Sequence, residues 1–239
     1  MKTSVQFGPS ADLDKARAIV AKFNSGAGGY HRLDFGNGLV LNGNYDMAKH
    51  LAYYHLPERL DGMRVLDVGS ASGFFSFETL RRGASVTAID VFPETCLLTH
   101  LAKAFDLNVR YVTKSVYDLT ASFGQFDLVI CGSLLLHLAD PLGALRALRQ
   151  VTSGRLVVST SPTPDSATNP APVCHFVGQK AVEGDYWCYW LLSAAALTRM
   201  LSAAGFTRVD NIEHFVLTPE PGRPPFVKPH PHVAMSAYV

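Results

Sequence analysis

The chain has 239 residues, 48% of them hydrophobic, and a formal net charge of +1. These values suit one globular domain and exclude disordered, collagen-like and coiled-coil classes. No run of lysine or arginine is longer than the pair Arg81-Arg82, so no nucleic-acid partner is expected. No signal-peptide core and no membrane-spanning apolar stretch stand out, so we expect a cytoplasmic protein without membrane contact, as a monomer or homodimer.

The four cysteines predict reduced thiols rather than a disulfide framework. They form no CxxC pair and lie in or beside apolar segments. His175 stands beside Cys174, but no second ligand lies near it in the sequence. We therefore expect no metal site. The cysteines are Cys96, Cys131, Cys174 and Cys188.

The first sixty residues predict a helical extension ahead of the core. Residues Asp12 to Phe23 carry apolar side chains at helical spacing, and Ser25–Gly29 interrupts that pattern. An Asn42-Gly43 turn then precedes a second expected helix, Asn44–Leu56, with Asn44 as its N-cap. We expect residues 1–60 to form this extension and residues 61–239 to form the main domain.

From Arg64 onward, short β-rich runs alternate with helical segments. This order predicts a doubly wound α/β fold, with a parallel sheet covered by helices on both faces. Two final runs, Thr207–Leu217 and His232–Val239, predict a terminal hairpin. The five expected parallel strands are Arg64–Val68, Ser85–Asp90, Val109–Thr113, Phe126–Cys131 and Arg155–Thr160.

Several helix ends are marked by their own residues. Pro93 and Pro141 suit first helical positions, and Asp140 suits an N-cap. Gly205 predicts the end of a helix over Ser193–Ala204.

The most informative segment is Val65–Phe74, an apolar strand that turns through small residues into a helix over Phe75–Arg82. Small residues let a backbone approach a ligand closely, and the following helix N-terminus presents unpaired N–H groups. Asp90 ends the next strand at about the twenty-residue offset at which such folds bind ribose hydroxyls. Together these features predict a bound nucleoside.

The turn is not a GxGxxG motif, because Ser70, Ala71 and Ser72 lie between Gly69 and Gly73. A dinucleotide is therefore less well suited than a ligand without a pyrophosphate. The nearby carboxylate of Asp67 would repel phosphate but suits the cationic methionine end of S-adenosylmethionine. The alternative is a glycine-rich turn with a purely structural role.

This segment resembles the first motif of class I S-adenosylmethionine-dependent methyltransferases, usually Asp/Glu-x-Gly-x-Gly-x-Gly. The chain keeps Asp67, Gly69 and Gly73 and has Ala71 in place of the middle glycine. The resemblance implies a Rossmann-like, seven-stranded, mostly parallel sheet with an antiparallel C-terminal strand. It also implies S-adenosylmethionine as cofactor and an N-terminal segment that closes over it as a lid.

The same resemblance suggests the remaining cofactor contacts. Asp90 matches the ribose-binding acid, and Val91-Phe92 match apolar residues beside adenine. Ser115 stands where an aspartate usually meets the adenine amino group, and the Val116 N–H would reach a ring nitrogen. The backbone after the fourth strand would approach the methionine moiety. The full predicted set is Asp67, Gly69, Ser70, Ala71, Gly73, Asp90, Val91, Phe92, Ser115, Val116, Gly132 and Ser133.

Three further segments resemble the branch that contains the tRNA wobble-uridine carboxymethyltransferase and its small-molecule relatives. They are Tyr30–Asp34, Leu136–Pro141 and the Trp190-x-x-Ser193 motif. The balanced charge favours a small-molecule acceptor over RNA.

The acceptor side has weaker signals. His137 follows the fourth strand, where a ligand lies in such folds, and could act as general base. Packing of a short helix is its alternative role, and methyl transfer can also run on proximity alone. Loop-flanking aromatic residues are predicted to bind the acceptor, although ordinary packing explains a dense aromatic cluster equally well. The predicted acceptor residues are Tyr30, His31, Tyr45, Tyr186, Trp187 and Trp190.

The sequence thus predicts a methyltransferase for the O, N or C atom of a small molecule, in secondary metabolism. Two alternatives stay open. An RNA-modifying enzyme with a carboxylated cofactor would need basic side chains around that carboxylate, and a nucleoside-binding regulatory protein would need no catalysis.

Overall fold

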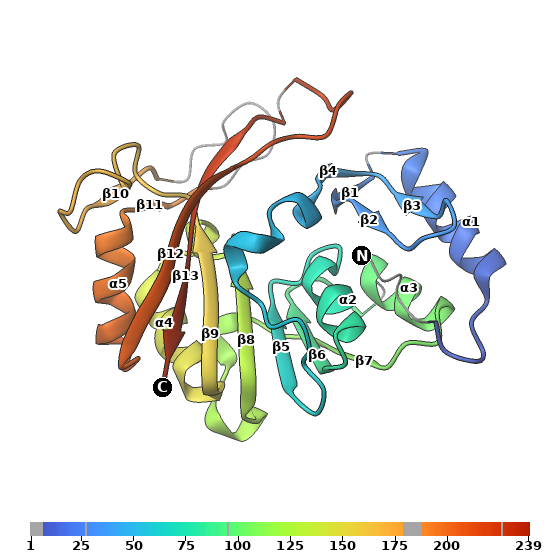
Figure 1. Cartoon of the computed structure of the whole chain (residues 1–239), viewed down its shortest axis with the longest axis horizontal. Helices are drawn as coiled ribbons and strands as arrows, with labels where there is room; N and C mark the ends of the chain where they lie inside the picture. The colour runs from blue at the N-terminus through green and yellow to red at the C-terminus, as the bar shows by residue number, and fades with distance from the viewer. Residues whose placement is uncertain (1–6, 27, 95, 179–187, 226) are drawn as a thin grey trace.

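The computed structural model describes residues 7–26, 28–94, 96–178, 188–225 and 227–239. A seven-stranded sheet lies at its centre, in the order β12-β13-β9-β8-β5-β6-β7 (Figure 1). Strands β5 to β9 pair in parallel, and β13 runs antiparallel to both β9 and β12. This confirms the predicted sheet. Its strands are β5 (Arg64–Val68), β6 (Ser85–Asp90), β7 (Val109–Thr113), β8 (Phe126–Gly132), β9 (Thr152–Thr160), β12 (Arg208–Leu217) and β13 (His230–Tyr238).

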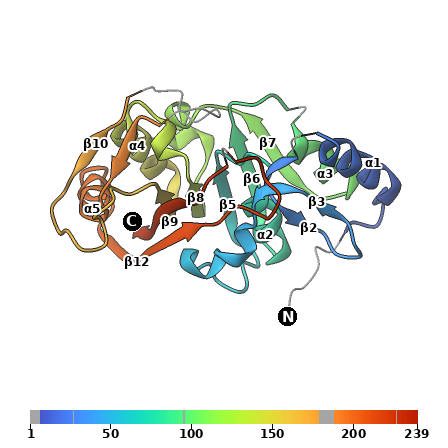
Figure 2. The same cartoon turned by 90° about the horizontal axis from the view of Figure 1, so that it is seen from above.

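Helices cover both faces of the sheet because successive apolar side chains of the strands point to opposite faces. Val65 packs into a core with α1, α2 and α3, whereas the next residue, Leu66, packs into a second core with α4 and α5. The described residues therefore form a three-layer arrangement (Figures 1 and 2). The helices are α1 (Leu13–Asn24), α2 (Phe74–Arg81), α3 (Leu97–Ala104), α4 (Pro141–Val151) and α5 (Ala194–Ala203).

The predicted start of α4 is confirmed, whereas the predicted start of α3 is wrong. The Asp140 carboxylate accepts a hydrogen bond from the Gly143 N–H at 2.8 Å, and Pro141 is the first residue of α4. Pro93 was expected to begin a helix, but α3 begins only at Leu97. The Phe92 carbonyl is bonded to two hydroxyl groups of β7, which keeps the chain on the sheet edge beyond Asp90 before the helix can begin.

The expected helix over Asn44–Leu56 is wrong. Strand β4 (Gly43–Tyr45) pairs in parallel with β1 (Gly29–His31), and two short 3-10 helices follow, η1 (Met47–Lys49) and η2 (Leu51–Tyr54). The N-cap is Asp46, whose carboxylate accepts from the Ala48 N–H at 3.1 Å. The N-terminal extension thus contains short strands as well as helices. The remaining elements are β2 (Leu33–Asp34), β3 (Val40–Leu41), β10 (Cys174–Phe176), β11 (Trp190–Leu192), η3 (Val116–Asp118), η4 (Ala121–Phe123) and η5 (Leu135–His137).

Tertiary contacts explain why residues 43–45 are extended. The connection between β12 and β13 reaches toward β4 (Figure 1). The Asn44 carbonyl accepts a hydrogen bond from the Glu220 N–H at 2.9 Å, and the Tyr45 hydroxyl donates to the Lys228 carbonyl at 2.9 Å. These bonds lie far outside the local sequence, so local helical periodicity could not reveal them.

The turn between β5 and α2 requires left-handed backbone conformations. Gly69 and Gly73 have φ angles of 71° and 88°, and Ala71 has a φ of 47°. An alanine in this region carries a steric cost that glycine does not, because its Cβ crowds the following carbonyl oxygen.

We predict that Ala71→Gly stabilises the protein by about 0.5–1 kcal/mol, despite the greater flexibility of glycine in the unfolded chain. Urea unfolding monitored by circular dichroism measures the change. Ala18→Gly is the matched control, since Ala18 is an exposed residue inside α1 and glycine there should destabilise by a similar amount. A loss of stability in Ala71→Gly equal to that in Ala18→Gly would contradict this prediction.

Candidate functional site

The sequence-predicted cofactor residues come together at the carboxyl ends of four neighbouring strands. Asp67 lies in β5, and the 69–73 turn follows that strand. Asp90 ends β6, Ser115 lies in the segment after β7, and Ser133 lies in the segment after β8. Parallel pairing in the order β8-β5-β6-β7 brings these ends to one edge of the sheet. Figure 2 gives the view from above.

The carboxylate of Asp90 is held by two backbone groups. One oxygen accepts from the Ala71 N–H at 2.9 Å, and the other accepts from the Val91 N–H at 2.7 Å. The first bond joins the end of β6 to the turn after β5. A carboxylate fixed in this way can still accept hydrogen bonds from ligand hydroxyls through its remaining lone pairs.

Asp67 is a buried carboxylate beside the same turn. Its side chain is 2% exposed and accepts a hydrogen bond from the Ser76 hydroxyl at 2.6 Å. Burial raises the pKa of Asp67 to about 7, and the charge of Asp90 adds to this effect. The buried Ser70 hydroxyl has no hydrogen-bond partner among the described residues. The turn therefore holds a carboxylate and a hydroxyl that a polar, cationic ligand would satisfy.

The residues predicted to contact adenine lie next to Asp90. Val91 and Phe92 are 69% and 57% exposed, which is unusual for apolar side chains at the end of a central strand. Ser115 accepts from the Tyr117 N–H at 3.3 Å and caps η3, and Val116 is buried. The exposed pair offers an apolar surface to a flat ring.

The segment after β8 packs against the turn. A Cβ added to Gly69 would lie 3.3 Å from the Leu134 side chain. Ser133 has a φ of 54°, and its N–H donates to the Ser159 carbonyl at 2.9 Å. The Ser133 hydroxyl lies 2.7 Å from Nε2 of His232 on β13. Gly132 leaves no room for a side chain, since a Cβ there would lie 2.7 Å from the Phe75 ring.

Three predicted acceptor residues gather over the turn. The Tyr30 N–H donates to the Ser72 hydroxyl at 2.9 Å, and the Tyr30 ring lies 4.9 Å from His31 and 5.5 Å from Tyr45. His31 is 7% exposed beside Phe74, and burial lowers its pKa to about 3. These contacts place the N-terminal segment directly on the predicted cofactor turn.

His137 lies in η5 with an exposed side chain. It is linked to the Tyr30 group through His230, whose pKa is lowered by burial and by the charge of His137. The His230 ring lies 6.0 Å from the Tyr45 ring. The structure thus brings His137 to the same side of the site as Tyr30 and Tyr45.

Sequence reasoning missed His230 and His232. They begin the last strand, after a proline-rich segment, and nothing local ties them to the segment after β8. The available signal was the Pro-His-Pro-His run at 229–232 that leads into an apolar strand. Alternation along a strand cannot show which distant loop the histidines meet.

The aromatic cluster predicted at 186–190 is described only in part. Tyr186 and Trp187 lie outside the described residues. Trp190 packs against Phe176 with ring centroids 4.8 Å apart, and its indole N–H donates to the Ala139 carbonyl at 3.1 Å. The first contact ties β11 to β10, and the second ties β11 to the segment between η5 and α4.

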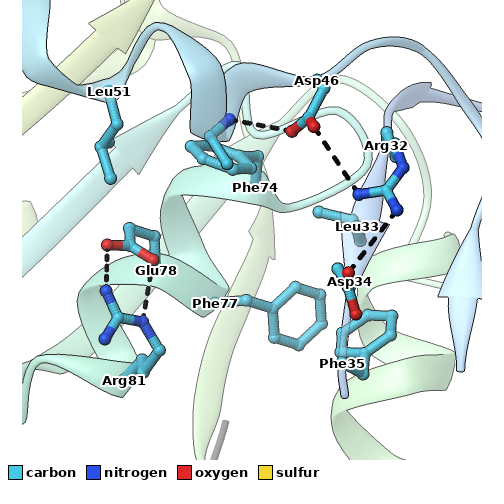
Figure 3. A pocket seen from close by; sticks show the side chains of 11 residues that line it. Arg32, Leu33, Asp34, Phe35, Asp46, Leu51, Phe74, Phe77, Glu78 and Arg81 are labelled. Carbon is cyan, nitrogen blue, oxygen red and sulfur yellow. Dashed lines mark hydrogen bonds and ion pairs between the residues drawn. The ribbon is translucent and has the colours of Figure 1, made fainter. Parts of the chain in front are cut away.

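A separate pocket lies between the N-terminal segment and α2 (Figure 3). Arg32 pairs with Asp34 at 3.5 Å and with Asp46 at 3.7 Å, and Arg81 pairs with Glu78 across one turn of α2. These ion pairs lie within the extension or within α2, whereas the Phe35 ring packs across the pocket against Phe77 of α2, with ring centroids 5.4 Å apart. None of the sequence-predicted site residues lines it. Its apolar lining consists of Leu33, Phe35, Ala48, Leu51, Phe74 and Phe77.

The described residues show neither a grouping of metal ligands nor a membrane-spanning helix. No group of three or more His, Cys, Asp or Glu side chains in that part of the chain is arranged to hold a metal ion. Every helix described there is too short or too polar to cross a lipid bilayer.

Comparison with known proteins identifies the family. A family model described as a methyltransferase domain matches residues 42–211. The chain belongs to this methyltransferase family. A ubiquinone biosynthesis O-methyltransferase from Xanthomonas euvesicatoria pv. vesicatoria (strain 85-10) is 33% identical over 165 residues, which is 67% of this chain and 69% of that protein. Its counterpart from Xanthomonas campestris pv. campestris (strain B100) is 42% identical over 105 residues, or 42% of this chain and 44% of that protein.

Solved structures share the fold of this methyltransferase. The N-terminal domain of EvdMO1 with bound S-adenosylhomocysteine superposes with a TM-score of 0.64 at 18% identity, over 97% of this chain and 99% of that one. The Burkholderia thailandensis 1,6-didemethyltoxoflavin-N1-methyltransferase gives a TM-score of 0.54 at 20% identity, over 95% and 79% of the two chains. The protein is a methyltransferase with the fold of these S-adenosylhomocysteine-bound enzymes.

The raised pKa of Asp67 predicts a pH-dependent affinity. Below pH 7 the buried Asp67 carboxyl group of the ligand-free protein is mostly neutral. The cationic end of the ligand favours the ionised carboxylate. Below pH 7, binding must therefore release a proton from Asp67. Affinity for S-adenosylhomocysteine should therefore rise about tenfold from pH 6 to pH 8. Isothermal titration calorimetry at several pH values measures this.

Asp67→Asn is the matched variant, since it keeps the shape but cannot ionise. Its affinity should be lower at pH 8 and independent of pH. The same tenfold pH dependence in Asp67→Asn would show that another group titrates.

Proposed function

We propose that this methyltransferase transfers the methyl group to the hydroxyl oxygen of a small aromatic acceptor. The carrying observation is the line of rings from Tyr30 through Tyr45 to His230, whose pKa is lowered by the charge of His137. Aromatic walls bind flat apolar rings by stacking and by edge-to-face contact. The hydrogen-bonding groups at the end of this line suit an acceptor that carries a polar reacting atom.

The choice of oxygen is supported by the relatives. The Xanthomonas proteins that match this chain are named as O-methyltransferases of ubiquinone biosynthesis. The Burkholderia N1-methyltransferase is only 20% identical, and it supports the fold alone. Transfer to nitrogen or carbon is therefore the second candidate, tested by the same panel of acceptors.

The residues at the carboxyl edge fit the cofactor. Asp90 would hold the ribose hydroxyls, the Val91-Phe92 pair would cover adenine, and Asp67 would balance the cationic methionine end. Ser115 and Val116 would meet the edge of the base, and the backbone at Gly132 and Ser133 would line the methionine side. When bound, S-adenosylmethionine supplies an electrophilic methyl group next to a positively charged sulfur.

The chain's own residues then hold the acceptor. Tyr30, His31 and Tyr45 would close over it from the N-terminal extension, which we propose as the lid. We propose His137 as a contact at the mouth of the site, because its side chain is exposed and lies close enough to repel charge on His230. Trp190 is proposed to flank the same entrance, and Tyr186 and Trp187, outside the described residues, stay proposed acceptor contacts.

Finer features remain proposals. The Tyr30–Asp34, Leu136–Pro141 and Trp190-x-x-Ser193 segments support a place beside the small-molecule relatives of the tRNA wobble-uridine carboxymethyltransferase. The net charge of +1 favours those relatives over an RNA-modifying enzyme. A role in secondary metabolism, a cytoplasmic location and a monomeric or homodimeric state complete the proposal.

We predict that labelled S-adenosylmethionine transfers its methyl group to phenols faster than to matched anilines or thiophenols. The rate should fall to background for the corresponding anisole, which has no hydroxyl hydrogen. A panel of mono- and dihydroxybenzenes, amines and heterocycles, analysed by mass spectrometry, measures the preference. Transfer to amines alone, or to RNA alone, would contradict the proposed acceptor.

A further inference from the structure

The hydrogen bond between Ser133 and His232 has a defined direction. Nδ1 of His232 lies 3.1 Å from the His230 carbonyl oxygen, and a carbonyl can only accept, so Nδ1 carries the hydrogen. The His232 side chain is 2% exposed, and burial lowers its pKa to about 4, which keeps the ring neutral. In a neutral ring the other nitrogen, Nε2, has a lone pair. The Ser133 hydroxyl therefore donates to Nε2 across 2.7 Å.

The pair has the form of an activated hydroxyl. A hydroxyl that donates to a histidine, which is itself oriented by a third group, is the arrangement that moves protons in serine enzymes. Here the orienting group is the His230 carbonyl. The φ of 54° at Ser133 is a left-handed conformation that a non-glycine residue rarely adopts, and it directly follows the end of β8.

The pair lies next to the predicted cofactor turn. Ser133 is half-buried, whereas His232 is buried, so Ser133 is the more accessible member of the pair. The adjacent residue, Leu134, packs on Gly69 of the cofactor turn. A second layer holds Ser133 in place, since Ser159 accepts its N–H and also bonds the Tyr54 hydroxyl at 3.1 Å.

We propose that Ser133 and His232 carry away the proton of the acceptor hydroxyl during methyl transfer. This rests on the proposed O-methylation. The bond between sulfur and the methyl carbon breaks, with its electron pair left on sulfur, while the acceptor oxygen bonds to the methyl carbon. The acceptor proton passes to the Ser133 oxygen as the serine's own proton passes to Nε2 of His232. The positive charge thus moves from the sulfonium to the imidazolium, and atoms and charge balance.

A weak base is sufficient for this step. An unreacted phenol is a poor acid, but its proton becomes strongly acidic as the oxygen forms a third bond, to the methyl carbon, and acquires oxonium character. General-base catalysis needs the base only at that moment. The buried imidazolium would then release its proton readily to solvent once the product leaves.

The groups around His232 are known from the structure. His230 on the same strand and His50 between η1 and η2 lower its pKa by like charge, and the His230 carbonyl acts in the opposite sense. Asp46 and Lys49 act on His50, and His137 acts on His230. The neighbouring Phe215 ring, 5.6 Å away, is uncharged.

The decisive variant is His232→Gln. A glutamine oxygen can still accept the Ser133 hydrogen bond but cannot take up the proton. If His232 only positioned Ser133, this variant would therefore keep its kcat. We expect kcat with the best phenol of the panel to fall by about 10²–10⁴, with the affinity for S-adenosylhomocysteine and the KM for the phenol nearly unchanged. Ser133→Ala should show the same loss of kcat.

The chain offers a matched control in a second serine–histidine hydrogen bond. Ser166 Oγ lies 3.1 Å from Nε2 of His214, outside the predicted site, so His214→Gln should keep the full kcat. His137→Ala should lower kcat by less than about tenfold, because His137 is a contact and not the base. If His232→Gln fails to fold, Ser133→Ala and the pH profile decide.

The pH profile separates the two histidines. At saturating substrates, kcat should stay constant from pH 8 to pH 5.5 if His232 takes the proton. An exposed histidine of ordinary pKa would instead cause about a tenfold fall at pH 5.5. That fall, abolished by His137→Ala, would overturn the relay and assign proton removal to His137.

A measurement without turnover completes the test. Nitrogen NMR of histidine-labelled protein with S-adenosylhomocysteine should show His232 protonated at Nδ1 only, at pH 5.5 as at pH 7.5. The opposite tautomer would overturn the relay, as would full kcat in His232→Gln. The proposed function fails separately, if the wild type methylates no hydroxyl acceptor at all.

Discussion

The hydrogen bond from the Ala71 N–H to the Asp90 carboxylate joins the turn after β5 to the last residue of β6, and both belong to the predicted cofactor site. It can form because β5 and β6 pair in parallel and in register, with Asp67 opposite Ala88 and Val68 opposite Ile89. This pairing brings the turn after one strand beside the last residue of the next. The turn makes this contact at the cost of a left-handed conformation at Ala71.

Burial sets the chemistry on both sides of this edge. On the cofactor side it raises the pKa of Asp67, so the carboxyl group is poised to ionise when a cation arrives. On the acceptor side it lowers the pKa values of His31, His230 and His232, so these rings stay uncharged beside a site for a positively charged cofactor. The same physical effect thus prepares one side to attract positive charge and prevents the other from repelling it.

Local sequence was sufficient for the sheet and the cofactor turn. The strand Arg64–Val68, the small-residue turn and Asp90 are each defined by neighbours in the sequence, and the alternation of strands and helices fixes their order. The capping of α4 by Asp140 is local in the same way. Their shared edge follows from the rule that parallel strands present their carboxyl ends together.

The sequence was less informative where the chain depends on distant contacts. Residues 43–45 have helical periodicity but pair with β1 and the segment before β13, which makes them extended. His232 meets Ser133 across 99 positions, and no local pattern announces such a contact. Pro93 shows a smaller version of the same effect, since the hydroxyl groups of β7 hold the preceding residues on the sheet.

The central claim is that the joined ends of β5 and β6 bind S-adenosylmethionine, and calorimetric titration of S-adenosylhomocysteine into Asp90→Ala tests it most directly. The account predicts a weaker affinity by about 1–3 kcal/mol, because the ribose hydroxyls lose a fixed acceptor. The variant should retain its circular dichroism spectrum. Unchanged affinity in a folded Asp90→Ala protein would contradict the account.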